Sequence, residues 1–282
     1  MPFDSTGKVS FDDIYTAPDP RAFFGALREL DYQIPQLAKP YFAKLIEGYR
    51  AYQHVAEQTV LDVGCSYGVN GALNRCDTTM DELFEHYGEA ASLEHEALLE
   101  SDRQLVRSRT GTNGVRFIGL DASAPALEYA HAAGFLDETI HADFEANDPN
   151  QEQQALLDRV DLVISTGCVG YVTEKTLIRI ARGARPWMAH FVLRMFSYEP
   201  VAASLAELGY ETTGIHGVFR QRRFASADEQ AQILDTLSAA GVDPQGLETE
   251  GWLYAQLYVS QPRGVATGLA SALSTLRERG WQ

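Results

Sequence analysis

The segment from Val60 to Gly68, which reads VLDVGCSYG, constrains the fold of this chain more than any other stretch. An apolar, partly β-branched run ends in an acidic residue, and the residues from Val69 to Leu73 then read as the start of a helix. Glycine at positions 64 and 68 permits a positive φ and leaves no Cβ where a ligand would approach. A strand, a tight turn and a helix N-terminus in this order predict a nucleotide-binding corner.

Three later segments read as the ends of further strands. They are GLDAS at 119–123, HADF at 141–144 and VDLVISTG at 160–167. In this order, the first three of the four segments resemble motifs I, II and III of the class I S-adenosylmethionine-dependent methyltransferases, with Ser66 standing where motif I usually has its middle glycine, and the last segment fits the fourth strand of that fold and its tip. The resemblance covers the region from about residue 55 to about residue 200 and is less specific outside it.

The resemblance implies that S-adenosylmethionine is the co-substrate. Asp62 would meet its amino group and Asp121 would accept hydrogen bonds from both ribose hydroxyls. Asp143 would accept from the adenine amine, and the backbone amide of Phe144 would donate to the adenine ring. The implied cofactor-binding set is Asp62, Gly64, Cys65, Ser66, Gly68, Asp121, Ala122, Ser123, Asp143, Phe144, Thr166 and Gly167.

Two other readings of the first motif remain open. The run from Gly64 to Gly68 also matches GxSxG, the nucleophile elbow of serine hydrolases, which would need an acid and a histidine such as His216 downstream. The run could also be a purely structural turn. Neither alternative accounts for Asp121 and Asp143 at successive strand ends.

Composition narrows the function further. The formal net charge is −16, from 23 basic and 39 acidic residues, so that a phosphate backbone is a poor partner. No apolar stretch approaches the roughly 20 residues of a membrane span, and the N-terminus does not resemble a signal peptide. The three cysteines show no zinc-binding spacing, and no carboxylate or histidine pair has metal-ligand spacing. We expect a cytoplasmic protein with a small-molecule substrate, no metal and no nucleic-acid or membrane partner, which could form a homodimer.

Alternating strand and helix patterns predict an α/β fold: a doubly wound, mostly parallel seven-stranded sheet with an N-terminal helical lid and a helical insertion. We expect a lid at 1–54, a core at 55–262 and a C-terminal helix at 263–282. The insertion is expected at 77–113, because Asp62 and Asp121 are 59 positions apart where about 20 are usual. Strands are expected at 59–64, 115–121, 138–142, 160–166, 189–196, 210–215 and 252–260, and helices at 68–75, 124–133, 151–157, 173–183, 200–208 and 227–239.

The N-terminal stretch, residues 13–54, predicts three short helices cut by prolines, among them Pro40. It is rich in aromatic residues, and in the resembled family such a segment folds over the cofactor as a lid. Tyr15, beside a Pro-Asp-Pro turn, is the aromatic residue we expect to contact a ligand. Tyr171, which follows the fourth strand, is the second catalytic candidate, because its ring or hydroxyl could face a sulfonium.

These residues favour methyl transfer to a small-molecule acceptor. The stretches 15–21 and 30–35 also resemble a bacterial methyltransferase-like family of secondary metabolism. Some proteins with the methyltransferase fold instead cyclise S-adenosylmethionine to azetidine-2-carboxylate and release methylthioadenosine, which is the first alternative. A non-catalytic S-adenosylmethionine-binding protein is the second.

Overall fold

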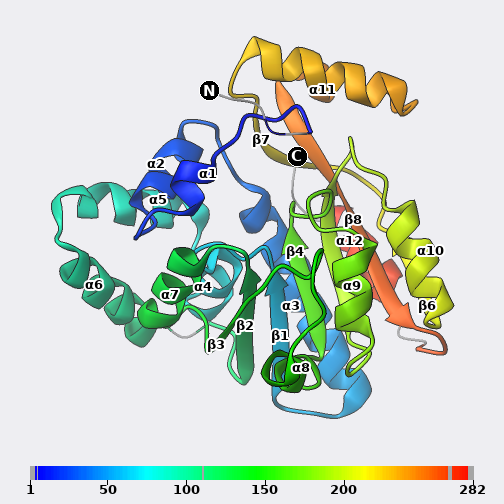
Figure 1. Cartoon of the computed structure of the whole chain (residues 1–282), viewed down its shortest axis with the longest axis horizontal. Helices are drawn as coiled ribbons and strands as arrows, with labels where there is room; N and C mark the ends of the chain where they lie inside the picture. The colour runs from blue at the N-terminus through cyan, green and yellow to red at the C-terminus, as the bar shows by residue number, and fades with distance from the viewer. Residues whose placement is uncertain (1–3, 5, 110, 266–268, 279–282) are drawn as a thin grey trace.

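A mostly parallel sheet forms the centre of this computed structural model, which describes residues 4, 6–109, 111–265 and 269–278 (Figure 1). The described residues form eight strands, and seven of them follow the order β3-β2-β1-β4-β5-β8-β6. Only β8 runs against its neighbours, so the doubly wound fold expected of a class I methyltransferase is confirmed. The strands are β1 (Gln58–Val63), β2 (Val115–Asp121), β3 (Glu138–His141), β4 (Leu162–Thr166), β5 (Trp187–Leu193), β6 (Tyr210–Gly214), β7 (Phe219–Arg223) and β8 (Trp252–Pro262).

The eighth strand, β7, corrects the prediction of seven. Both β6 and β7 pair antiparallel with β8, with Gly214 opposite Tyr258 and Phe219 opposite Ala255. The two therefore form one long edge strand that is interrupted at 215–218. The sequence analysis did not predict β7, because the charged residues of FRQRR suggest a solvated loop. In the structure, the third and fourth side chains of this strand are buried.

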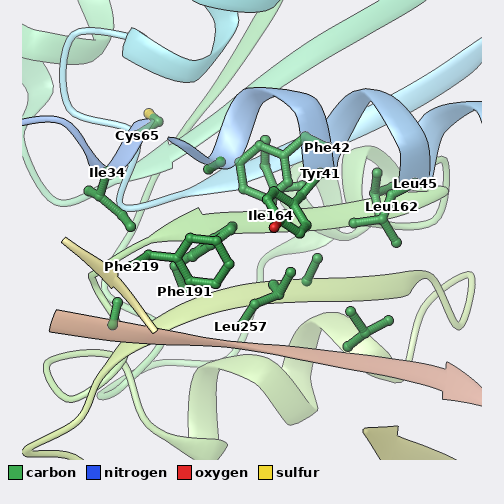
Figure 2. Close-up of a cluster of buried hydrophobic side chains, with 14 of the residues drawn as sticks. Ile34, Tyr41, Phe42, Leu45, Cys65, Leu162, Ile164, Phe191, Phe219 and Leu257 are labelled. Atoms are coloured by element: carbon green, nitrogen blue, oxygen red, sulfur yellow. The ribbon is translucent and has the colours of Figure 1, made fainter. Parts of the chain in front are cut away.

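Helices cover both faces of the sheet, which explains why the central strands are apolar at nearly every position. On one face, Tyr41, Phe42 and Leu45 of α3 (Ile34–Gln53) pack against Phe191 and its neighbours (Figure 2). This face also receives α7 (Ala124–Ala133), α11 (Ala227–Ala239) and α12 (Leu269–Glu278). The other face is covered by α8 (Gln151–Leu157), α9 (Glu174–Ala181) and α10 (Glu199–Glu207).

The N-terminal helices are α1 (Asp12–Tyr15), α2 (Arg21–Arg28) and α3. The expectation of short helices cut at Pro40 is wrong, since α3 is a single helix of 20 residues that contains this proline. Its apolar face is buried against the sheet, and this packing outweighs the hydrogen bond that a proline removes. Thus α3 packs on the sheet, whereas α1 and α2 lie at the end of the sheet where β1 and β2 end (Figure 1).

The helical insertion between α4 (Val69–Arg75) and β2 contains α5 (Met80–Glu89), a 3-10 turn and α6 (His95–Ser108). Asp102 of α6 is fully buried and accepts hydrogen bonds from His86 Nε2 and from the hydroxyls of Tyr87 and Tyr129, at 2.6, 3.0 and 2.6 Å. One carboxylate thereby joins α5, α6 and α7. The insertion also holds α2, because the rings of Phe24 and Tyr87 stack with centroids 4.3 Å apart. Across the described parts of the chain, no helix has the length and apolar character of a membrane span.

Candidate active site at the strand ends

The turn between β1 and α4 has the backbone conformation that its glycines predict. Gly64 and Gly68 have φ values of 66° and 72°, and Ser66 between them has a φ of 48°. A left-handed conformation costs a residue with a Cβ about 1–2 kcal/mol. Ser66 occupies the position where the resembled motif has glycine, and its backbone keeps the left-handed conformation in spite of the strain that its Cβ causes.

Gly64 is required by packing as well as by φ. A Cβ on Gly64 would lie 2.5 Å from the Cβ of Cys168, which follows β4. The thiol of Cys168 donates to the carbonyl of Val63 at 3.1 Å. Cys65 points into the core on the α3 side of the sheet, as Figure 2 shows. These residues build the turn and bring the end of β4 against it.

Asp121, at the end of β2, ties the second motif to the first. Its Oδ2 accepts from the backbone N–H of Ser66 at 2.8 Å, and its Oδ1 accepts from that of Ser123 at 2.9 Å. Each carboxylate oxygen can accept more than one hydrogen bond, so both keep capacity for a ligand. The adjacent registers of β1 and β2, with Val63 opposite Leu120, place this carboxylate beside the turn.

Asp62 is fully buried one residue before the end of β1. Asn70 Nδ2 donates to its two oxygens at 3.0 and 3.2 Å and lies 3.1 Å from Thr166 Oγ1. Burial raises the pKa of Asp62 to about 7, the Asn70 hydrogen bonds oppose this rise, and the charge of Asp121 adds to it. Asn70 was missed by the sequence reasoning, and its place in the first turn of the helix after Gly68 was the available signal.

Two buried polar atoms at this turn have no hydrogen-bond partner among the described residues. They are the hydroxyl of Ser66 and Oδ1 of Asn70. A buried polar atom without a partner costs about 1–3 kcal/mol, and native structures retain few of them. Both atoms flank the carboxylates of Asp62 and Asp121, so a polar ligand bound here would satisfy them.

In the third motif, the side chain of Asp143 is exposed. Asp143 Oδ1 accepts from the backbone N–H groups of Glu145 and Ala146 at 2.9 and 3.3 Å and so caps its own turn. The ring of Phe144 is buried in the core, whereas Ala122 is exposed and accepts from His141 at 3.0 Å. The adenine contacts implied for Asp143, Phe144 and Ala122 stay a prediction.

The chain before α2 is fastened across the ends of β1 and β2. The hydroxyl of Tyr67, within the first motif, donates to the carbonyls of Ile14 and Ala17 at 2.9 and 2.8 Å. Ser123 Oγ donates to the carbonyl of Tyr15 at 2.7 Å. Two motif residues therefore hold α1, which positions Tyr15 above the strand ends. Tyr67 was missed because its motif position is variable.

The loop after β4 meets the N-terminal segment and β7. Gly167, with a φ of 103°, allows Gln221 of β7 to approach, because a Cβ there would lie 2.5 Å from Gln221 Nε2. The hydroxyl of Tyr171 donates to Asp4, and the ammonium of Lys8 lies 5.0 Å from the centre of its ring. Burial and the hydrogen bond with Asp4 hold the pKa of Tyr171 above its ordinary value, so its hydroxyl stays protonated at neutral pH.

Two large cavities open near these loops, and neither is lined by Asp62, Gly64 or Asp121. A cavity of about 610 Å³ lies between the end of β5, α10 and the β6–β8 edge. A larger cavity of about 1090 Å³ lies between the starts of α3 and α5 and the pair β7–β8. Tyr32 lines the larger one, and burial raises the pKa of its hydroxyl while the nearby Thr166 side chain, at the end of β4, opposes this rise. Within the described residues, no cluster of three or more His, Cys, Asp or Glu has metal-binding geometry.

No family model matches this chain, and no curated protein matches it. It is similar in structure to many S-adenosylmethionine-dependent methyltransferases. A TehB-like methyltransferase from Corynebacterium glutamicum is 14% identical over 75% of this chain and 86% of its own, with a TM-score of 0.36. A methyltransferase from Geobacter sulfurreducens in complex with S-adenosyl-L-homocysteine is 14% identical over 78% and 90%, with a TM-score of 0.34. A putative sarcosine dimethylglycine methyltransferase from Galdieria sulphuraria is 14% identical over 80% and 86%, with a TM-score of 0.40.

Proposed function

We propose that this protein binds S-adenosylmethionine at the ends of β1 and β2 and transfers its methyl group to a small-molecule acceptor. The observation that carries the proposal is the pair of carboxylates, Asp62 and Asp121, on either side of the left-handed turn at Gly64–Gly68. A buried carboxylate beside unpartnered polar atoms suits a cationic, hydroxyl-rich ligand. S-Adenosylmethionine has an ammonium, a sulfonium and two ribose hydroxyls.

The residues have distinct roles in this proposal. Asp62 attracts the ammonium group, and Asp121 accepts from the ribose hydroxyls with the capacity that Ser66 and Ser123 leave free. Asp143 and Phe144 hold the adenine. Gly64, Cys65, Gly68, Ala122, Ser123, Thr166 and Gly167 shape the backbone around the ligand.

The chemical step is an in-line displacement. The acceptor atom forms a bond to the methyl carbon while the carbon–sulfur bond breaks, its electron pair stays on sulfur, and S-adenosylhomocysteine is released. Alignment of the two reactants can supply up to about 7–11 kcal/mol of the barrier. Tyr15 and Tyr171, on segments that close over the strand ends, are the proposed aligning residues, and a general base is needed only if the acceptor carries a proton to be lost.

Calorimetric titration with S-adenosylmethionine tests the binding site. We expect Asp121→Ala to weaken binding about tenfold or more, because about 1.4 kcal/mol corresponds to tenfold. Asp158→Ala is the matched control: this aspartate is exposed and accepts from Gln154 of α8, away from the turn. Equal affinity of the wild-type protein and Asp121→Ala would exclude Asp121 from the site.

One observation favours a second candidate function. The N-terminal segment is fastened over the strand ends by Tyr67 and Ser123, and neither large cavity reaches the carboxylates. A reaction within S-adenosylmethionine itself, which forms azetidine-2-carboxylate and methylthioadenosine, would need no acceptor there.

Mass spectrometry separates the candidates. Incubation with S-adenosylmethionine alone should leave it intact under the primary proposal, and S-adenosylhomocysteine should form once a bacterial metabolite extract is added. Methylthioadenosine together with a four-membered-ring amino acid, from S-adenosylmethionine alone, would instead establish cyclisation. Binding without turnover in either condition would identify a non-catalytic binding protein. Only the formation of methylthioadenosine and the four-membered-ring amino acid would replace methyl transfer by another reaction.

A further inference from the structure

The larger cavity, of about 1090 Å³, is lined by six aromatic side chains together with aliphatic, polar and charged residues. Tyr32 and Tyr41 come from the N-terminal helical region, Phe84 from α5, and Trp252 and Tyr254 from β8. Its volume is close to the upper end of the range for small-molecule sites, which combine apolar walls with a few polar groups. The cavity adjoins the loop after β4, because Gln33, which lines it, donates its backbone N–H to Gln221, whose side chain approaches Gly167.

One polar group in this cavity is held in place without a charge partner. The guanidinium of Arg220 lies 4.9 Å from the centre of the Trp252 ring, and its Nε donates to the Tyr254 hydroxyl at 3.4 Å. Among the described residues, no carboxylate lies within ion-pair distance of Arg220. Stacking on an aromatic ring fixes the plane of a guanidinium, and the donors that remain form the fork that binds a carboxylate.

The neighbouring arginine shows the contrast. Arg223 lies over the same ring, at 4.4 Å, but its Nε donates to Asp31 at 2.6 Å, so its charge is already matched. In a chain with 39 acidic and 23 basic residues, an arginine that lines a cavity and has no carboxylate partner is conspicuous. Arg28 also lines the cavity, and of the three carboxylates there, Asp31 is paired with Arg223, whereas Asp81 and Glu85 come from α5. The charges therefore favour an anionic group at Arg220 and disfavour one beside α5.

We propose that this cavity is the acceptor site, and that it takes a molecule with an aromatic or otherwise apolar body whose carboxylate is bound by Arg220. That the bound molecule is the methyl acceptor rests on the function proposed above, whereas the binding of an aromatic carboxylate does not depend on it. The apolar body lies among the rings, and the carboxylate receives hydrogen bonds from the terminal nitrogens of Arg220. The end of the molecule nearest Tyr32 then faces Thr166 and the ends of the strands.

The test uses 2-naphthoate and its uncharged relative 2-naphthamide, titrated by calorimetry or by ligand-observed NMR. The wild-type protein should bind the carboxylate about tenfold more tightly than the amide, since charge-assisted hydrogen bonds are about twice as strong as neutral ones. Arg220→Gln should reduce this preference to about twofold, with most of the loss in the affinity for 2-naphthoate. Arg220→Lys should give an intermediate preference, because it keeps the charge and loses the fork.

Arg116→Gln is the matched control. It removes the same charge from β2, where Arg116 pairs with Glu138 outside the cavity. A preference that falls equally in Arg116→Gln would show that only net charge matters and would overturn the proposal. Equal binding of the two probes to the wild-type protein, or a preference that survives in Arg220→Gln, would also overturn it.

The failure of this proposal can be distinguished from the failure of the proposed function. If S-adenosylmethionine binds and Arg220→Gln does not change the probe preference, the cofactor site stands and the cavity assignment is wrong. If the wild-type protein shows the Arg220-dependent preference but no affinity for S-adenosylmethionine, the cavity site stands and the methyltransferase proposal is wrong.

Discussion

Asp62→Asn should stabilise the folded protein and weaken its binding of S-adenosylmethionine. The pKa of this fully buried carboxyl is raised from 3.8 to about 7, mainly by burial. The difference of about 3 pKa units corresponds to about 4 kcal/mol, at 1.36 kcal/mol for each unit. This is an upper limit on what the ionised carboxylate costs the folded state. The new amide keeps one acceptor for Asn70 Nδ2, which donates to both oxygens of Asp62 in the wild-type protein.

The pH dependence of this effect has a definite sign. Below about pH 4 the Asp62 carboxyl is protonated in both the folded and the unfolded states, so it costs nothing. As the pH rises from about 4 to about 7, the unfolded chain releases the proton while the folded protein retains it, and stability is lost. The advantage of the variant should therefore grow from about 2 kcal/mol at pH 5.5 to about 4 kcal/mol at pH 8.

Urea unfolding at pH 5.5, 7 and 8.5, followed by circular dichroism, measures these differences. The two proteins are compared at each pH, so that contributions common to both cancel. Calorimetry at pH 8 should show that the variant binds S-adenosylmethionine about tenfold more weakly, because the ammonium loses a charged partner. A variant that is less stable than the wild-type protein at pH 8, or whose advantage does not change with pH, would refute this account of Asp62.

Asp102→Asn is the matched control, because Asp102 is also fully buried. Its two oxygens accept from three donors, on His86, Tyr87 and Tyr129. An amide in its place would direct N–H groups at donors, and we expect a loss of about 1–3 kcal/mol at every pH tested. The same substitution at two buried aspartates should thus have opposite effects on stability.

Two further predictions concern the turn and the segment that covers it. Ser66→Gly should stabilise the protein by about 1 kcal/mol, because relief of the left-handed strain exceeds the added flexibility of the unfolded chain; an unchanged urea midpoint would contradict this. Tyr67→Phe removes the hydroxyl that donates to the carbonyls of Ile14 and Ala17. A hydrogen bond of this kind contributes about 0.5–1.5 kcal/mol. Native-state tryptic cleavage after Lys8 and Arg21 should therefore accelerate several-fold. Cleavage at the wild-type rate would show that other contacts hold the segment.

Much of the fold follows from local sequence patterns. The helices predicted at 124–133, 151–157 and 227–239 and the strand at 115–121 have the predicted bounds. Each of these helices begins at a Ser or Asn N-cap whose side chain accepts from the third helical N–H, a signal confined to four residues. The fifth strand is less well placed, at Trp187–Leu193 rather than 189–196. Buried on both faces, it carries an apolar run without alternation, and such a run does not mark its own ends.

Other features depend on contacts between distant parts of the chain. Pro40 lies within α3 because the helix is packed on the sheet, and β7 forms because β8 has a free edge beyond β6. Arg222 of β7 is buried only because Glu229 of α11 accepts from both of its terminal nitrogens, at 2.9 and 2.7 Å. The periodicity of hydrophobic residues does not reveal such pairs of residues on different elements. The left-handed turn could be predicted from its glycines, but its connection to Tyr67 and the N-terminal segment could not.

The buried carboxylates of Asp102 and Asp62 differ in how completely the described residues satisfy them. In the insertion, the carboxylate of Asp102 is fully satisfied by residues from two helices besides its own. At the ends of β1 and β2, among the residues that the structure describes, Asp62 has a single side-chain donor, and Ser66 and Asn70 each keep a buried polar atom without a partner. A structural turn would gain stability by losing these groups, since each costs about 1–3 kcal/mol. Their presence beside one another is explained if a polar, cationic ligand completes the site.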